Sequence, residues 1–275
     1  MIRIGVIGDG EPARAHAAAF DGCASVVAGG EELLGSVDAI VVASEPDLRF
    51  HHAALALEHG LDVLIEQPVA PTQENARMLE RIASLRPSPA VVQVSQPDHF
   101  NPALRMLSDQ TLLAIDFRRH ASGLGGMLHD IYTVTELARS PLVRVHASGH
   151  AGYAVATLVF ESGLIATLAA GEAGPGPRCR VLATTADSEI AIDALTGAVE
   201  VARAASCVRT QMEIGDPLAA QAQSFLRAVR ERSRPEVSLR TAIACLEVSD
   251  RVRECLAVQA AAAGLPAQAA PGAAD

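Results

Sequence analysis

The chain contains no lysine, because all 22 of its basic residues are arginine. Without lysine there is no side-chain amine to form a Schiff base or to act as a catalytic acid or base. A nucleotide-binding Walker motif is excluded as well, since it requires a lysine at the phosphates. The missing residue type therefore removes a whole class of mechanisms before any motif is considered.

Cysteine and long apolar runs are also scarce. The five cysteines are odd in number, widely spaced and form no C-x-x-C pair, so we expect neither disulfides nor a metal site. No apolar run reaches the ~18 residues of a membrane helix, so no membrane partner is expected. Met1 leads directly into a strand pattern without a signal peptide, and we therefore expect a cytoplasmic protein.

Positive charge is not in excess either. The formal net charge is −10, and no basic stripe is visible along the chain, so a nucleic-acid partner is not expected. Apolar residues make up 49% and charged residues 20%, which is typical of a globular protein. A chain of 275 residues is long enough for one large or two modest domains.

The first part of the chain alternates apolar strands with helical segments. We expect strands at residues 2–7, 24–28, 38–43, 61–65 and 90–95. Helices are expected between them at 12–20, 47–59 and 72–84. This alternation predicts βαβ units and a parallel sheet.

After about residue 96 the pattern changes to a run of strands. We expect strands at 112–119, 142–149, 153–160, 163–170, 178–186 and 188–193. Further helices are expected at 101–108, 127–139, 216–231 and 239–261. The run of strands predicts a second, mostly antiparallel sheet. The expected domains are therefore residues 1–97 and 98–260, followed by a flexible tail at 261–275.

A glycine-rich turn follows the first strand. Gly8-Asp9-Gly10-Glu11-Pro12-Ala13 matches G-x-G-x-x-A at the start of a helix, which is typical of a dinucleotide-binding fold. Glycines permit close approach of a pyrophosphate, and the helix start offers N–H groups to it. All six residues are candidate cofactor contacts. The alternative is a tight turn without a ligand, which the carboxylate of Glu11 favours.

The same motif requires an acidic residue about 20 positions later for the ribose of the adenosine. Glu31 is a candidate, but Glu31 and Glu32 also fit the exposed start of a short helix. Asp38 follows Gly29 by only nine positions, which is too short for a full strand–helix–strand return. Either the second strand is kept and the unit after it is lost, or the second strand itself is missing.

Several further motifs occur in a fixed order. In the first half they are Gly5-Val-Ile-Gly8-Asp-Gly10, Asp38 to Pro46, Ala56-Leu-Glu-His-Gly60, Glu66-Gln67-Pro68 and His99-Phe-Asn-Pro102. In the second half they are Gly125-Gly-Met-Leu-His-Asp130, Ala156 to Thr167, Asp216-Pro-Leu218 and Phe225 to Val229. Through these motifs the chain resembles the Gfo/Idh/MocA family of glucose–fructose oxidoreductase, inositol dehydrogenase and their relatives.

The resemblance implies a fold, an activity and a set of contacts. The fold is α/β, with a shortened N-terminal Rossmann-type parallel sheet and a C-terminal α/β domain whose open sheet is mostly antiparallel. The activity is hydride transfer between NAD or NADP and a small, often sugar-like substrate. Cofactor contacts are implied at Ser44, Glu45 and Glu66, and substrate contacts at His99 and Asn101. A homodimer or higher oligomer is implied through the open face of the C-terminal sheet, where Tyr153, Val155, Thr157 and Val159 share one face.

The sequence departs from the family at its catalytic positions. The family lysine is replaced by Gln67, the family aspartate corresponds to Asp130, and the position four residues later is Val134. Gln67 can hydrogen-bond a substrate but cannot titrate. Replacement proton donors are His129, Tyr132 or His99, each of which is also compatible with a structural or surface role. Asp130 is likewise compatible with a hydrogen bond inside its helix.

A cluster of basic residues, Arg118-Arg119-His120, is interpreted as a solvated strand end rather than an anion site. Two functional hypotheses remain. The first is an NAD(P)-dependent oxidoreductase of non-standard mechanism that acts on a small carbonyl, imine or sugar-like substrate. The alternative is a redox-inactive relative, with its cofactor site lost, that works as a non-redox biosynthetic enzyme or as a ligand-binding or regulatory protein.

Overall fold

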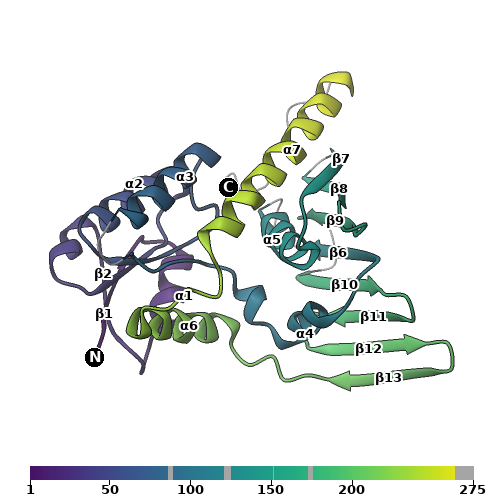
Figure 1. Ribbon diagram of the computed structural model, residues 1–275, viewed down its shortest axis with the longest axis horizontal. Coiled ribbons are helices and arrows are strands. Elements are labelled where there is room, and N and C mark those ends of the chain that lie inside the picture. Colours follow the sequence, from purple (N-terminus) through teal and green to yellow (C-terminus); the bar gives the residue numbers. More distant parts are fainter. Residues whose placement is uncertain (86–88, 121–124, 151, 173–175, 264–275) are drawn as a thin grey trace. The chain divides into compact units, whose positions relative to one another are not determined.

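The computed structural model describes residues 1–275 except 86–88, 121–124, 151, 173–175 and 264–275 (Figure 1). The chain forms two compact units. Among the described residues, the first contains those of Met1–Phe100 and Asp216–Leu246, and the second contains those of Asn101–Gly215 and Glu247–Ala263. From residue 264 the expected tail lies outside the described residues.

The first unit is built on a parallel sheet. Its strands are β1 (Arg3–Ile7), β2 (Ser25–Gly29), β3 (Ala39–Val42), β4 (Asp62–Ile65) and β5 (Val92–Val94). They are ordered β2-β1-β3-β4-β5, and every neighbouring pair is parallel. All residues of β3, β4 and β5 are buried, and apart from Asp62 and Gln93 they are apolar, as expected for central parallel strands. The Rossmann-type sheet is confirmed.

The shortening of this sheet follows the first of the two alternatives. β2 is kept as the edge strand beside β1. The chain then returns to β3, on the other side of β1, through the single 3-10 helix η1 (Glu31–Gly35). The strand–helix unit that would normally extend the sheet beyond β2 is therefore the part that is missing.

Helices pack against the parallel sheet of the first unit. They are α1 (Glu11–Ala19), α2 (Pro46–Glu58), α3 (Gln73–Ser84), the 3-10 helix η2 (Pro97–Phe100) and α6 (Pro217–Glu231). Phe225 of α6 meets Phe20 edge-on, with ring centroids 6.3 Å apart, in a core that includes Ile4 and Val6 of β1. The apolar face of α6 is thus buried in the first unit, although sequence analysis placed residues 216–231 in the second domain.

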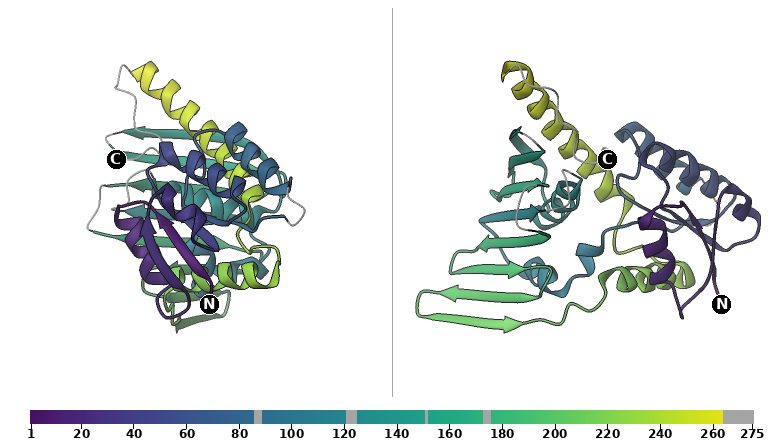
Figure 2. Two further views of the ribbon diagram at one scale, coloured as in Figure 1. Left: turned by 90° about the vertical axis from the view of Figure 1, so that its left-hand side faces the viewer. Right: turned by 180° about the vertical axis from the view of Figure 1, so that it is seen from behind.

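The second unit is built on one broad sheet. Its strands are β6 (Ala114–His120), β7 (Leu142–His150), β8 (Tyr153–Phe160), β9 (Ile165–Gly171), β10 (Arg178–Thr184), β11 (Ser188–Asp193), β12 (Ala198–Arg203) and β13 (Ser206–Gln211). They are ordered β13-β12-β11-β10-β6-β9-β8-β7 and lie side by side (Figure 2). Among the described strands of this second sheet, only the β6–β9 pair is parallel, so the mostly antiparallel sheet is confirmed.

The two faces of this sheet differ. Along β8 the alternate residues Ala154, Ala156, Leu158 and Phe160 are buried, and α5 (Gly126–Ala138) contacts β6 and β9. Tyr153, Val155, Thr157 and Val159 are more exposed and share the other face, as predicted. The remaining helices are α4 (Pro102–Arg105), the 3-10 helix η3 (Met106–Asp109) and α7 (Leu239–Ala263). Within the part of the chain that the structure describes, no helix is both long and apolar enough to cross a bilayer.

Candidate functional site

The glycine turn between β1 and α1 contains two glycines with different constraints. Gly8 has φ +139°, and a Cβ added there would lie 2.5 Å from the carbonyl oxygen of Ala43, so the fold itself requires glycine. Gly10 has an ordinary φ of −76°. The nearest atom to a Cβ at Gly10 is Pro12 Cδ, at 3.5 Å. Packing therefore does not require glycine at position 10, and the small residue leaves the backbone of the helix start open to close approach.

The first turn of α1 is available to an anion. Gly10 is the N-cap residue, and no described side chain caps the helix start, so its first N–H groups point toward solvent or a ligand. Ala13 is buried in the contact between helix and sheet, which is the role predicted for it. Arg14 donates from Nη1 to the carbonyl oxygen of Asp9 at 3.0 Å and so adds a positive charge beside the turn. Glu11 and Pro12 are exposed.

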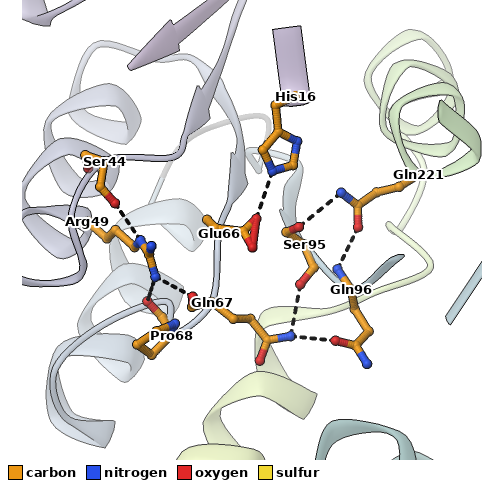
Figure 3. Close-up of polar contacts among 9 residues, drawn as sticks. All are labelled: His16, Ser44, Arg49, Glu66, Gln67, Pro68, Ser95, Gln96 and Gln221. Atoms are coloured by element: carbon orange, nitrogen blue, oxygen red, sulfur yellow. Dashed lines mark hydrogen bonds and ion pairs between the residues drawn. The ribbon is translucent and has the colours of Figure 1, made fainter. Parts of the chain in front are cut away.

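Glu66 lies at the carboxyl end of β4 and contacts α1. Its Oε2 is 2.8 Å from Nε2 of His16, whose side chain is only 3% exposed (Figure 3). Sequence analysis selected Glu66 but did not assign a function to His16. The family motif indicated the acid, whereas its partner is 50 positions away and is identified only by the packing of α1.

Gln67 is held by a network of amides at the carboxyl ends of β4 and β5. Its Nε2 donates to the carbonyl oxygen of Ser95 and to Oε1 of Gln96, both at 2.9 Å (Figure 3). Gln96 in turn donates its backbone N–H to Oε1 of Gln221 at 2.6 Å, and Gln221 Nε2 contacts Ser95 Oγ at 3.2 Å. Both N–H groups of Gln67 are thereby used, so toward a substrate its amide can act only as an acceptor.

Arg49 connects the Gln67–Pro68 segment after β4 to Ser44 after β3. The buried guanidinium donates from Nε to the carbonyl oxygen of Ser44 at 2.7 Å and from Nη1 to the carbonyl oxygens of Gln67 and Pro68 (Figure 3). Burial lowers the pKa of Arg49, while the Glu66 and Glu45 carboxylates raise it. Sequence analysis missed this residue, because an arginine inside a helix carries no motif signal.

Ser44 and Glu45 follow β3 directly. Ser44 is buried, and its Oγ lies 2.8 Å from Nδ1 of His52. Glu45 is exposed at the N-cap of α2. In open parallel sheets, ligands bind outside the carboxyl ends of the strands, and this is where the glycine turn, Ser44, Glu66 and Gln67 lie in the first unit.

The predicted catalytic helix α5 belongs to the second unit. Asp130 is fully buried, and its Oδ1 accepts hydrogen bonds from Nη2 and Nε of Arg119, at 2.7 and 3.0 Å. Arg119 is therefore a buried ion-pair partner and not part of a solvated strand end, which corrects the interpretation made from sequence. The reason is the strand alternation: Arg118 faces the open side, where it pairs with Asp116 at 2.9 Å, and Arg119 faces α5.

The other candidates differ in exposure. His129 is partly exposed, whereas Tyr132 is fully buried. His99 Nε2 lies 3.7 Å from Oε2 of Glu236 within the first unit. Asn101 is the N-cap residue of α4: it accepts from the N–H of Ala103 at 3.0 Å and donates to the carbonyl oxygen of Ala194 at 2.8 Å. These bonds give Asn101 a structural role, and its geometry does not support the substrate contact expected from sequence.

Metal chemistry receives no support from side-chain clusters. Among the described residues, no group of three or more His, Cys, Asp or Glu side chains is arranged to hold a metal ion. The polar groups gathered at the strand ends of the first unit include amides, the serines Ser44 and Ser95, the Glu66–His16 pair and Arg49. They suit an organic ligand with phosphate and hydroxyl groups better than a metal ion.

Comparison with known proteins gives the same assignment for the first unit. Residues 2–95 match the family model of the Gfo/Idh/MocA oxidoreductases, described as an oxidoreductase family with an NAD-binding Rossmann fold. No match is found among curated protein sequences.

Solved structures match the fold of the whole chain. UDP-N-acetylglucosamine 3-dehydrogenase GnnA from Acidithiobacillus ferrooxidans superposes with a TM-score of 0.86 at 22% identity, over 94% of this chain and 98% of that chain. A dehydrogenase from Chromobacterium violaceum gives 0.82 at 19% identity, over 96% and 97%. A mutant of KijD10, a 3-ketoreductase from Actinomadura kijaniata in complex with TDP-benzene and NADP, gives 0.79 at 17% identity, over 93% and 98%.

The glycine turn, the parallel sheet and the mixed second sheet therefore agree with the family match. Residues 2–95 are therefore similar to the Gfo/Idh/MocA oxidoreductase family, whose model describes an NAD-binding Rossmann fold.

Proposed function

We propose that this protein is an NAD(P)-dependent oxidoreductase that acts on a small carbonyl, imine or sugar-like substrate by a mechanism without lysine. The observation that carries the proposal is Gly10. The fold does not require glycine there, and the residue lies at an uncapped helix start beside a positively charged arginine. This arrangement fits a pyrophosphate. Two of the similar structures, a UDP-N-acetylglucosamine 3-dehydrogenase and a 3-ketoreductase, support a sugar-like substrate.

In this proposal the first unit binds the cofactor. The backbone from Gly8 to Ala13 holds the pyrophosphate, and Glu66, fixed by His16, accepts a hydrogen bond from the cofactor. When bound, the nicotinamide cofactor supplies or accepts the hydride. Ser44 and Arg49 keep the ends of β3 and β4 in place and thereby shape the site.

Gln67 orients the substrate and does not transfer a proton. Since both of its N–H groups are bound to Ser95 and Gln96, its Oε1 accepts a hydrogen bond from a substrate hydroxyl. Reduction of a carbonyl also requires a proton at the carbonyl oxygen. The donors considered from the sequence lie on α5 of the second unit, where His129 is partly exposed, Tyr132 is fully buried and the Asp130 carboxylate is bound by Arg119.

The alternative, a redox-inactive ligand-binding protein, is favoured by one observation. The family lysine is replaced by Gln67, whose amide N–H groups already donate hydrogen bonds within the protein. A protein that only binds its ligand needs no titratable group there. The two functions differ in a measurable way, because only the first requires binding of a nicotinamide dinucleotide.

We also propose that the open face of the second sheet joins two copies of the chain. This face holds a shallow hollow of ≈ 900 Å³ whose lining includes Asp116, Arg118, Arg180, Asp193, Glu200 and Arg209. Equal numbers of acidic and basic groups on one surface suit contact with an identical surface. Sedimentation of the purified protein tests this, and a monomer at micromolar concentration contradicts it.

Direct titration with NADH and NADPH tests the proposed function. Calorimetry or nicotinamide fluorescence is expected to give micromolar binding of at least one of them. A Gly10→Val variant is expected to lose binding while it stays folded, because the added side chain blocks the pyrophosphate. Gly35→Ala is a matched control, since a Cβ there meets no described atom within 4 Å. Absence of binding for reduced and oxidised forms alike contradicts the proposal and favours the redox-inactive alternative.

A further inference from the structure

Two histidines and a glutamate meet where the chain leaves β2. Nε2 of His51 lies 3.0 Å from Oε1 of Glu31, and Nε2 of His52 lies 3.8 Å from the same oxygen. The two imidazole rings have centroids 5.6 Å apart. The other nitrogen of His52, Nδ1, contacts Ser44 Oγ at 2.8 Å. One carboxylate oxygen thus faces two imidazoles that lie on a different element, the helix α2.

The position of this cluster gives it a functional meaning. Glu31 is the second residue after the end of β2. In dinucleotide-binding folds, the acid at this point hydrogen-bonds the ribose of the adenosine, where NADP carries an additional 2′-phosphate. The side chains of Glu31 and His51 are 51% and 61% exposed, so both can reach a ligand. His52 is 13% exposed and lies behind them.

Two further charged side chains, Glu32 and Arg49, lie on the elements that form the cluster. Glu32 is the other acid of η1. Its Oε1 accepts the backbone N–H of Gly30 at 2.8 Å, and this hydrogen bond lowers its pKa. Arg49 contacts the Ser44 carbonyl, but its guanidinium continues to the carbonyl oxygens of the Gln67–Pro68 turn. When both imidazoles are neutral, the end of β2 therefore carries the two negative charges of Glu31 and Glu32.

We propose that His51 and His52, paired with Glu31 at the end of β2, make the choice between NADH and NADPH depend on pH. The inference rests on the proposed binding of a dinucleotide by the first unit. With neutral imidazoles, the two carboxylates repel a 2′-phosphate, whereas Glu31 still accepts the 2′-hydroxyl of NADH. The positive charges of protonated imidazoles offset the negative charges of the carboxylates, and their N–H groups donate to the phosphate. NADPH then binds.

The surroundings of His52 shift its protonation to lower pH. Burial lowers the pKa of His52, and the neighbouring His51 lowers it further, whereas Glu31 raises it. His52 therefore becomes charged at a lower pH than an ordinary imidazole. The exposed His51 is the residue that contacts the phosphate directly, and His52 adds its charge from behind.

The experiment measures the dissociation constants of NADH and NADPH at about pH 6 and about pH 8, at one ionic strength. For the unmodified protein, the ratio of the NADPH constant to the NADH constant is expected to fall by about tenfold or more at the lower pH. Glu31→Gln is expected to lower this ratio at the higher pH. The 2′-phosphate itself has a pKa of about 6. In a His51→Gln, His52→Gln double variant, the pH dependence of the ratio that remains comes from protonation of this phosphate.

His59→Gln is the matched control, because His59 lies at the end of the same helix, where its Nδ1 contacts the carbonyl oxygen of Leu55 at 2.9 Å. A pH dependence that is equal in the double variant and in the unmodified protein overturns the inference but leaves the proposed function intact. Absence of binding of both dinucleotides at both pH values overturns the proposed function, and this inference with it.

Discussion

Arg119 and Asp130 form a buried ion pair that joins β6 to α5. The distance from Nη2 of Arg119 to Oδ1 of Asp130 is 2.7 Å, the aspartate is fully buried, and the arginine side chain is 13% exposed. The aspartate that the family motif marks as catalytic is therefore held by a cation from its own unit. A position-by-position comparison of motifs does not reveal such a partner.

Replacement of Arg119 by Met is expected to destabilise the protein by about 3–5 kcal/mol, because it leaves the Asp130 charge buried without this partner. Urea unfolding followed by circular dichroism measures the loss. Arg118→Met is the control: Arg118 is exposed on the neighbouring position of β6, and its loss is expected to change the free energy of unfolding by about 0.5 kcal/mol or less. Equal effects of the two variants contradict a special role of the buried pair.

The two glycines of the turn are expected to respond differently to alanine. Gly8→Ala places a Cβ 2.5 Å from the Ala43 carbonyl oxygen at φ +139°, and we expect a loss of about 2–4 kcal/mol in stability. Gly10→Ala is expected to change stability by about 1 kcal/mol or less, since position 10 has room and ordinary backbone geometry. Thermal unfolding of both variants decides the matter. A Gly10 variant as unstable as the Gly8 variant would show that the fold, and not a ligand, requires glycine there.

Gln67→Lys restores the residue type that the chain lacks everywhere. An ammonium group has three donors and can replace the hydrogen bonds to Ser95 and Gln96, so we expect the variant to fold. If the rest of the site keeps the family geometry, the variant gains dehydrogenase activity with sugars or polyols. Formation of NADH or NADPH at 340 nm measures this.

Gln67→Met controls for the substitution, because it has similar length but no titratable group. A gain with methionine equal to that with lysine argues against a role of the ammonium group. A folded Lys variant that binds dinucleotide but shows no gain with a panel of sugars and polyols shows that other parts of the site have also diverged.

Acid is expected to weaken the contact between Arg3 and Asp38. Oδ2 of Asp38 accepts the backbone N–H of Arg3 at 2.8 Å, and this bond, followed by that to the Arg3 side chain, lowers the Asp38 pKa below 3.8. A lowered pKa in the folded state stabilises the protein above the unfolded pKa. This contribution is lost as the pH falls through the folded value.

Asp38→Asn is therefore expected to be less stable than the unmodified protein near neutral pH, with the difference shrinking as the pH is lowered below about 4. Urea unfolding of both proteins at several pH values measures the difference. A difference that stays constant with pH contradicts the assignment of the effect to the Asp38 charge.

Much of the fold follows from local patterns in the sequence. The strands expected at residues 153–160 and 188–193 are found with the same bounds, because alternating apolar residues have a single way to face the core. The hairpin of β12 and β13 was not predicted. All six residues of β13 are exposed, so that strand carries no apolar alternation, and it exists because its backbone pairs with β12.

Some residues of the candidate site could likewise be identified from sequence, and others could not. The glycine turn, Glu66 and the loss of the lysine at Gln67 could be identified from sequence, because each belongs to a motif with fixed spacing. His16, Arg49 and Arg119 could not. Each acts through a partner that is distant in sequence or through backbone carbonyls, and such contacts leave no local pattern.

The sequence by itself determined the parallel sheet, the mixed sheet, the glycine turn and the absence of every lysine mechanism, since periodicity, glycine spacing and composition are local properties. The tertiary structure decided that β2 is kept as an edge strand, that α6 packs in the first unit, and that the Gln67 amide is left only as an acceptor. These outcomes depend on which distant groups satisfy each buried surface and each hydrogen-bond donor, and only the folded chain brings those groups together.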